Sequence, residues 1–247
     1  MTDETLPTRP DRVADSERKR RGALLFLRDI LIIVVIALLV SFLIKTFVVR
    51  SFYIPSGSME NTLQISDKII VNELQPSVFP LSRGDVVVFR DPGGWLPPKA
   101  PVQRNPVASA VDTALTFVGL SASDSDDHLV KRLIGLPGDR VACCDAAGRI
   151  TVNGVAIDEP YTIIEPGQTN AATVRFAVTV PAGAIWVMGD NRYNSQDSSR
   201  NQSLPGHGFV PLDHVVGRAF VVSWPVQRWS WLDDYPEVFR GVEENKE

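Results

Sequence analysis

Cysteine and histidine are scarce in this sequence, which argues against a metal site. Its 247 residues include two cysteines, the adjacent Cys143 and Cys144, and three histidines. Two thiols without a nearby histidine do not match the ligand sets of zinc sites, so we expect no metal. Because neighbouring side chains in a strand point to opposite faces, we expect two separate, partly buried thiols rather than a disulfide.

Positive charge is also in short supply. The formal net charge is -4 at pH 7, which gives no electrostatic reason to expect nucleic acid as a partner. Helical patterns are scarce after residue 50, and the sequence contains no internal repeat. The function must therefore be sought in one long apolar run and a few short motifs.

The apolar run extends from Ile30 to Val49 and is interrupted by three polar residues. About 20 residues at roughly 1.5 Å each span a hydrocarbon core, so we predict a transmembrane anchor over residues 23–50. A cleaved signal peptide is the alternative, but no small-x-small cleavage site closes the run, which favours a permanent anchor. Residues 1–22 are polar and are predicted to form a tail without a core.

Basic residues set the expected orientation of the anchor. Five of them precede the run, from Arg18 to Arg28, against Lys45 and Arg50 at its other end. The more basic flank stays in the cytoplasm, so we expect a single-pass protein of the plasma membrane with a cytoplasmic N-terminus. Residues 51–232 then lie outside, next to membrane lipid.

The external part is predicted to be mainly antiparallel β. Short runs with β-branched residues alternate with glycine and proline turns, and Asn153-Gly154 favours a tight hairpin. Residues 92–127 are predicted to be a loop insertion containing a short helix over Val107–Leu120, and residues 233–247 a loosely attached acidic tail. The predicted strands are Lys68–Val71, Asp85–Phe89, His128–Ile134, Arg149–Val152, Arg175–Val180, Ala184–Met188 and Val215–Val222.

A candidate nucleophile follows the anchor within a few residues. In Pro55–Met59 a proline and a glycine flank two serines, so a tight turn can present the Ser58 hydroxyl with Ser56 as a neighbouring donor. By composition alone such a run is more often an ordinary turn. Catalysis would also require a base, because a serine hydroxyl is a weak nucleophile.

Two kinds of base are available. A histidine is one, with His207 or His214 oriented by Asp190, Asp197 or Asp213. A lysine kept neutral by burial is the other. After excluding lysines in the anchor, the tail and the proline-rich stretch, Lys68 and Lys131 remain, and Lys131 is enclosed by apolar neighbours. Periodicity does not decide between a buried lysine and an exposed one.

Four separated blocks resemble, in order, those of the bacterial type I signal peptidases. These are membrane-anchored serine-lysine endopeptidases that remove secretory signal peptides. The similarity covers the anchor and nearly all of the external part. The blocks are Ile54–Met59 with Thr62-Leu63, Arg83–Phe89, Val130–Asp139 and Met188–Ser198.

The resemblance implies a role for each matched residue. Ser58 is the expected nucleophile, Lys131 the general base, and Ser56 with the Ser58 amide the oxyanion hole. Ser195 is expected to orient the lysine, with Asp190 and Asp197 as supporting carboxylates.

The resemblance also implies a substrate and a fold. Phe52, Ile54, Pro55 and Val130 are expected to line small pockets for signal peptides of secretory preproteins, which carry small residues before the cut. The expected fold is a β-rich catalytic core with an inserted second β lobe. No cofactor is implied.

Three positions depart from the family pattern. Asn61 stands where the family often has proline, and Tyr193 occupies a usually polar position. Ser199 separates Ser198 from Arg200, so the arginine that pairs with Asp190 is uncertain by sequence: Arg200 is expected, with Arg192 as the alternative.

Two other functions stay open at this level. One is a serine-lysine protease dedicated to a specialised substrate, such as a conjugation or pilus precursor. The other is a catalytically idle β module that binds export partners, and a peptide cleavage assay discriminates between activity and its absence.

Overall fold

The structure is a computed structural model that describes residues 25–42, 48–97 and 127–244. Two compact units divide the chain, residues 1–46 and 47–247, and each is treated by itself. The predicted tail over residues 1–22 lies outside the described residues. So do the helix predicted over Val107–Leu120 and most of the predicted insertion.

The first unit contains the helix Leu25–Phe42, whose 18 residues are long and apolar enough to cross a membrane. The predicted anchor boundary at residue 50 is wrong. Val49 and Arg50 belong to strand β1 (Val49–Tyr53), which pairs with β2 (Lys68–Asn72). This strand could not be recognised in the sequence, because Val48 and Val49 continue the apolar run and no turn residue separates the run from the strand.

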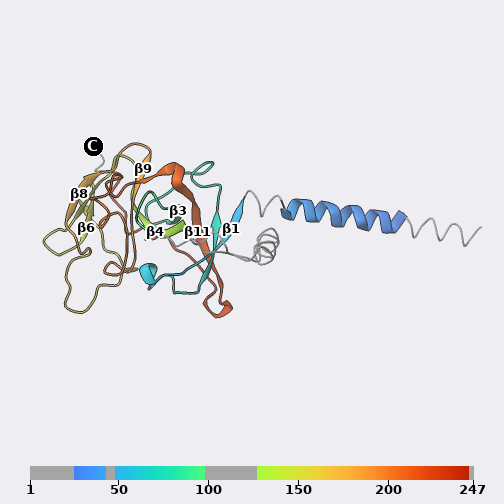
Figure 1. Ribbon diagram of the computed structural model, residues 1–247, viewed down its shortest axis with the longest axis horizontal. Coiled ribbons are helices and arrows are strands. Elements are labelled where there is room, and N and C mark those ends of the chain that lie inside the picture. Colours follow the sequence, from blue (N-terminus) through green and yellow to red (C-terminus); the bar gives the residue numbers. More distant parts are fainter. Residues whose placement is uncertain (1–24, 43–47, 98–126, 245–247) are drawn as a thin grey trace, which may run out of the picture. The chain divides into compact units, whose positions relative to one another are not determined.

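A sheet of eight strands, antiparallel throughout, forms the body of the second unit (Figure 1). Along it the order is β1-β2-β11-β3-β4-β9-β10, with β12 paired to β11. The further strands are β3 (Val86–Arg90), β4 (His128–Gly135), β9 (Ala184–Met188), β10 (Val210–Pro211), β11 (Val215–Trp224) and β12 (Ser230–Trp231).

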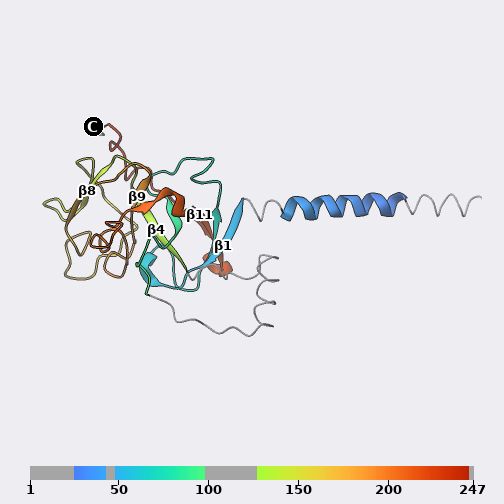
Figure 2. The ribbon, with the colours of Figure 1, turned by 45° about the horizontal axis from the view of Figure 1, so that its top comes forward.

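A smaller sheet is inserted in the chain between β4 and β9. Its order is β7-β6-β5-β8, and it consists of β5 (Arg140–Cys143), β6 (Ile150–Val152), β7 (Val155–Ala156) and β8 (Phe176–Thr179). Both views place β8 at the end of the unit opposite β1 (Figures 1 and 2). The predicted fold, mainly β with an inserted second β lobe, is therefore confirmed. Asn153 and Gly154 both have positive φ and connect β6 to β7, as the hairpin prediction requires.

Strand β3 shows how the body of the unit is packed. Val86 and Val88 belong to one apolar cluster, and Val87 and Phe89 belong to another. Because side chains alternate along a strand, each face of the sheet is covered by its own core. The first five residues of β4, His128–Arg132, pair with β3, and β4 also contacts the turn that carries Ser58.

The C-terminal segment is attached, so the prediction of a loose acidic tail from residue 233 is wrong. Phe239 and Val242 are buried in the core of the smaller sheet, and Glu243 forms an ion pair with Arg83. Composition misled the prediction, because the acidic residues of the segment lie between a few apolar ones that carry the packing.

The expectation of two separate thiols is also wrong, because a disulfide joins Cys143 and Cys144 in the structure. Strand β5 ends at Cys143, so the alternation of an extended strand does not include Cys144.

Candidate active site

The nucleophile turn follows strand β1. After Pro55 the chain forms a single 3-10 turn, η1 (Gly57–Met59), whose residues are buried. A Cβ at Gly57 would lie 2.7 Å from the carboxyl carbon of Glu60, so a larger residue here would require the Glu60 side chain to move. From behind, Asn191 N donates to Ser58 O over 3.1 Å. The Ser58 hydroxyl is thus held on a turn that is packed on both sides.

Lys131 lies next to this hydroxyl. Its Nζ is 2.7 Å from Ser58 Oγ and 2.9 Å from Val130 O, and the residue is only 3% exposed. Burial lowers the pKa of Lys131 to about 8, although the carboxylates of Asp197 and Asp190 act in the opposite direction. A lysine in this state can exchange a proton with a serine near neutral pH.

Ser56 provides a second hydroxyl beside the first. Its Oγ donates to Ser58 Oγ over 3.4 Å, and it lies at the start of η1 in an extended conformation. The structure therefore brings together Ser56, Ser58 and Lys131 from two distant blocks of sequence.

Asp190 is bound by Arg132, so the expectation that Arg200 pairs with Asp190 is wrong. Arg132 Nε and Nη2 donate to the two carboxylate oxygens of Asp190 over 2.9 and 2.8 Å, and both side chains are fully buried. The Thr62 hydroxyl, in the nucleophile block, donates to Asp190 as well.

The other two arginines have different partners. Arg192 forms an ion pair with Glu159 at 2.6 Å, and Arg200 Nη2 donates to Tyr193 O over 2.7 Å. The alternative expectation, that Arg192 pairs with Asp190, is therefore also wrong. The extra Ser199 is absorbed by a tight turn in which its amide and hydroxyl both donate to Asp197.

Asp197 and Ser195 surround the glycine that precedes Asp190. Asp197 accepts from Gly189 N over 3.0 Å, and a Cβ on Gly189 would lie 2.3 Å from Ser195 Oγ and 2.5 Å from Ser58 O. Within the described residues the buried Ser195 hydroxyl has no hydrogen-bond partner. Ser195 therefore lies beside the Ser58 turn, its hydroxyl makes no hydrogen bond to Lys131, and its orienting role stays a prediction.

A narrow cleft of about 100 Å³ leads to the two reactive groups. It is lined by all four residues that the sequence assigned to substrate binding, Phe52, Ile54, Pro55 and Val130. Leu96 and His128 are among its other lining residues, and the centroids of the His128 and Phe52 rings are 5.3 Å apart.

The histidine alternative finds no support in these contacts. Asp190 and Asp197 are engaged by Arg132, Gly189 and Ser199 as described above. His214 Nδ1 is buried with no hydrogen-bond partner in the described part of the chain, so no carboxylate accepts a hydrogen bond from that nitrogen.

Comparison with known proteins identifies the family. A model of the family "Signal peptidase, peptidase S26" matches residues 27–224. A signal peptidase I of Mycobacterium tuberculosis is 36% identical over 236 residues, which cover 89% of this chain and 80% of the relative. The chain belongs to the S26 family of signal peptidases. It is therefore a serine endopeptidase by family.

Two further relatives, both signal peptidases by name, agree with this assignment. A probable signal peptidase I of Mycobacterium leprae is 37% identical over 242 residues, covering 87% of this chain and 81% of the relative. The signal peptidase I of Pseudomonas aeruginosa is 31% identical, with 81% of this chain and 74% of the relative covered. A crystal structure of an Enterococcus faecalis signal peptidase I, 24% identical, covers 56% of this chain and 95% of its own, with a TM-score of 0.36.

Sequence reasoning missed the role of Arg132, which forms hydrogen bonds to the other three blocks of this S26 peptidase's site. Arg132 donates to Asp190, to Thr62 Oγ1 over 3.2 Å and to Gly84 O over 2.7 Å, and so connects all four blocks of the site. The available signal was its position beside Lys131 in a strand of otherwise apolar residues. A buried cation requires a buried carboxylate partner, and Asp190 lies in another block.

Proposed function

We propose that this chain is a membrane-bound signal peptidase I that cleaves N-terminal signal peptides from secreted precursors after small-x-small sites. Ser58 is the nucleophile and Lys131 the general base. The observation that carries the proposal is the 2.7 Å separation of Lys131 Nζ and Ser58 Oγ at a buried position.

Acylation begins with a proton transfer. Neutral Lys131 takes the Ser58 hydroxyl proton while Oγ attacks the scissile carbonyl carbon. Negative charge develops on the carbonyl oxygen, where the Ser56 hydroxyl and the Ser58 amide are placed to donate; such a donor is worth about 3 kcal/mol in comparable hydrolases. The Lys131 ammonium then gives its proton to the leaving amine as the C–N bond breaks.

In deacylation a water molecule is the nucleophile, Ser58 is the leaving group, and Lys131 is again the base. The acyl-enzyme is an ester of Ser58 with the last residue of the signal peptide. Lys131, neutral again, takes a proton from a water molecule that attacks this ester. The C–O bond breaks, Ser58 regains a proton from the lysine, and the signal peptide leaves with a free carboxylate.

The cleft supports the preference for small residues. An extended peptide places every second side chain on the same face, so the residues at the first and third positions before the cut face the same wall. Phe52, Ile54 and Val130 form that wall, and the space between them suits a methyl group rather than a large side chain.

Membrane attachment has support in each unit. The helix Leu25–Phe42 has the length and composition of a membrane span. In the second unit, the turn between β11 and β12, with η4 (Val226–Arg228), exposes large apolar side chains, which occur in membrane-interface belts. These are Trp224 (54% exposed), Val226 (65%), Trp229 (59%) and Trp231 (67%).

The test is cleavage of a signal-peptide substrate by the full-length chain in detergent micelles. Wild type should cut after an Ala-x-Ala site, while Ser58→Ala and Lys131→Ala should be inactive and still show a cooperative thermal unfolding transition. Lys68→Ala is the matched control, because Lys68 lies in β2 of the same sheet and is only partly buried.

Retained activity in Ser58→Ala or Lys131→Ala would overturn the mechanism. Activity confined to one specialised precursor would favour the dedicated protease over general secretion. A survey of precursors that accumulate uncleaved after depletion of the protein separates these two cases.

A further inference from the structure

The C-terminal segment, residues 233–244, lies beyond the family match, which ends at residue 224. It nevertheless contacts the buried arginine beside the catalytic lysine. We call this segment the C-terminal strap. Its contacts bear on how the active site is held in place.

The strap covers one side of the Arg132 guanidinium. Asp233 O accepts a hydrogen bond from Arg132 Nη1 over 3.0 Å, and the Tyr235 ring centroid lies 5.3 Å from the guanidinium carbon. Tyr161 contacts the same carbon at 4.0 Å, and the rings of Tyr161 and Tyr235 are 5.0 Å apart. Arg132 is thus enclosed by two tyrosines, each placed for a cation–π contact.

A glycine makes this approach possible. Gly84, in the second family block, has a φ of +90°, and a Cβ there would lie 1.7 Å from Asp234 O. Arg132 also donates to Gly84 O, so the strap, the second block and the arginine meet at one point. Any side chain at Gly84 would displace the strap.

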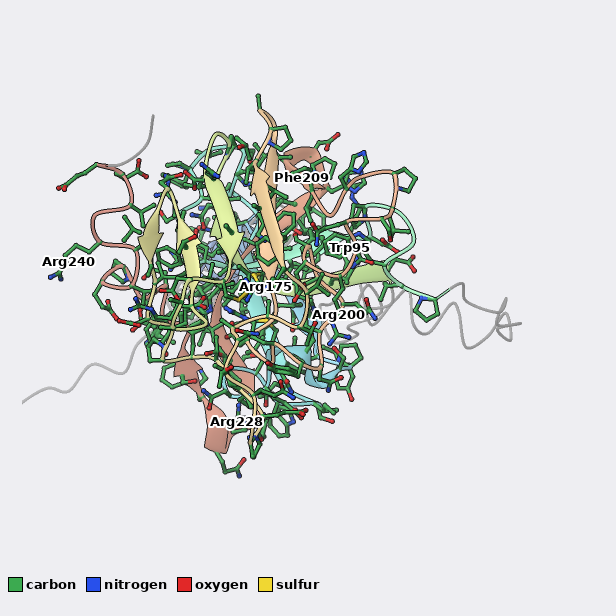
Figure 3. The ribbon with its side chains drawn as sticks, turned by 90° about the vertical axis from the view of Figure 1, so that its left-hand side faces the viewer. Trp95, Arg175, Arg200, Phe209, Arg228 and Arg240 are labelled. Atoms are coloured by element: carbon green, nitrogen blue, oxygen red, sulfur yellow. A yellow bond between two sulfur atoms is a disulfide. The ribbon has the colours of Figure 1, made fainter. Side chains whose placement is uncertain are left out.

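The strap is fixed at its far end as well. Phe239 and Val242 are buried in the core of the smaller sheet, and Val242 O accepts from Asn153 Nδ2 over 3.2 Å. By contrast, the Arg240 side chain projects away from the body of the protein (Figure 3). Attachment at both ends holds Tyr235 against the arginine.

Displacement of Arg132 has a defined consequence for Lys131. The charged groups that act on Lys131 are the carboxylates of Asp197 and Asp190, and its nearest polar neighbour is Ser58. Arg132 neutralises Asp190. If the guanidinium moves or becomes hydrated, Asp190 is less compensated and water reaches the lysine, and both changes favour the charged form of Lys131.

We propose that the C-terminal strap positions the Ser58–Lys131 pair through Arg132, with Tyr235 as the positioning residue. The inference rests on the proposed function, since it assumes that Lys131 is the base. Tyr235 acts through its ring face on Arg132 and does not touch the reacting atoms.

The experiment is the pH profile of kcat/KM from pH 6 to 10 for Tyr235→Leu, Tyr235→Phe and Phe209→Leu in the full-length chain. Phe209 is the matched control, because it is a partly buried aromatic residue that packs against the core of the smaller sheet, with its ring centroid 5.5 Å from that of Trp186. Thermal unfolding of each variant is measured alongside.

We expect Tyr235→Leu to shift the rising limb upward by about one pH unit. The rate then falls about tenfold below that limb and recovers at high pH. Tyr235→Phe should keep the wild-type profile, because it retains the ring. Phe209→Leu should unfold at a lower temperature without moving the limb. Tyr235→Met replaces Tyr235→Leu if the latter does not fold.

An unmoved limb in Tyr235→Leu or Tyr235→Met overturns the strap proposal, as does an equal shift in Phe209→Leu. Failure of the proposed function gives a different result, namely a Lys131→Ala protein that still cleaves the peptide. The two failures are therefore distinguishable.

Discussion

Arg132 Nε and Nη2 bind the two oxygens of Asp190 over 2.9 and 2.8 Å, with no exposure of either side chain to solvent. Removing either member of such a pair destabilises the protein, because the remaining charge is then buried without a partner. The pair also links β4, which carries Lys131, to the end of β9, which continues into Asp190. It is therefore the structural centre of the site.

Arg132→Ala should destabilise the protein by about 3–5 kcal/mol, because it leaves the Asp190 carboxylate buried and unpaired. Arg200→Ala is the control, since the Arg200 guanidinium donates to a backbone carbonyl and forms no ion pair with Asp190. Urea denaturation of both variants measures the difference. Equal losses of unfolding free energy would contradict the assignment of Arg132 as the partner.

Much of the fold was predictable from the sequence. Runs of β-branched residues and turns such as Asn153-Gly154 predict the strands, and the family resemblance implies an inserted lobe without locating it. Strand β1 was missed because it adjoins the apolar run. The attachment of residues 233–244 was missed because it depends on contacts with residues far away in the sequence, such as Gly84 and Arg83.

The candidate site was predictable in its members more than in their pairing. Motif order identified Ser58 and Lys131, but no pattern states which of several arginines meets Asp190. Pairing depends on the direction in which each side chain leaves its element. Arg132 leaves β4 beside Lys131, whereas Arg200 lies on a loop and turns back to Tyr193.

The activity should depend on pH in the way set by Lys131. The base must be neutral, and burial lowers its pKa to about 8, so kcat/KM should rise with pH through about 8 rather than near 10.5. Lys131→Arg should be inactive, because guanidinium does not release its proton in this range. Peptide cleavage across the pH range checks both.

Three control variants test the choice of base. Lys68→Ala, His207→Ala and His214→Ala should keep most activity. Loss of activity in a histidine variant would favour the histidine base.

The free energy of unfolding should also depend on pH through Lys131, and it should rise as the pH rises. The pKa of Lys131 is lower in the folded state, about 8, than the ordinary lysine value of 10.5 that it has in the unfolded chain. The unfolded state therefore binds more protons between these values, and this group makes stability rise with pH across that window. The shift corresponds to about 3 kcal/mol. Urea unfolding at pH 7 and pH 10 should show this rise in wild type and its absence in Lys131→Met.

The Ser56 hydroxyl should matter in the transition state more than in binding. Ser56→Ala should lower kcat by about 10² to 10³ with little change in KM, because the donor acts on charge that develops during attack. Ser56→Thr, which keeps a hydroxyl, is the matched variant and should retain more activity. Steady-state kinetics on a signal-peptide substrate separates the two parameters. An effect confined to KM would assign Ser56 to substrate binding or to the structure of the turn.

The orientation of the chain in the membrane should follow from its basic residues. Five of them, from Arg18 to Arg28, lie directly before the apolar run, and this flank should hold the N-terminal tail in the cytoplasm with Ser58 outside. Protease added to spheroplasts should then digest the large β-rich unit while a tag fused before Met1 survives. Replacing Arg18, Lys19, Arg20 and Arg21 by glutamine should weaken this preference and yield a mixed population. Digestion of the tag together with protection of the β-rich unit in the wild-type chain would show the opposite orientation, and Ser58 could not then meet a signal peptide as it emerges outside.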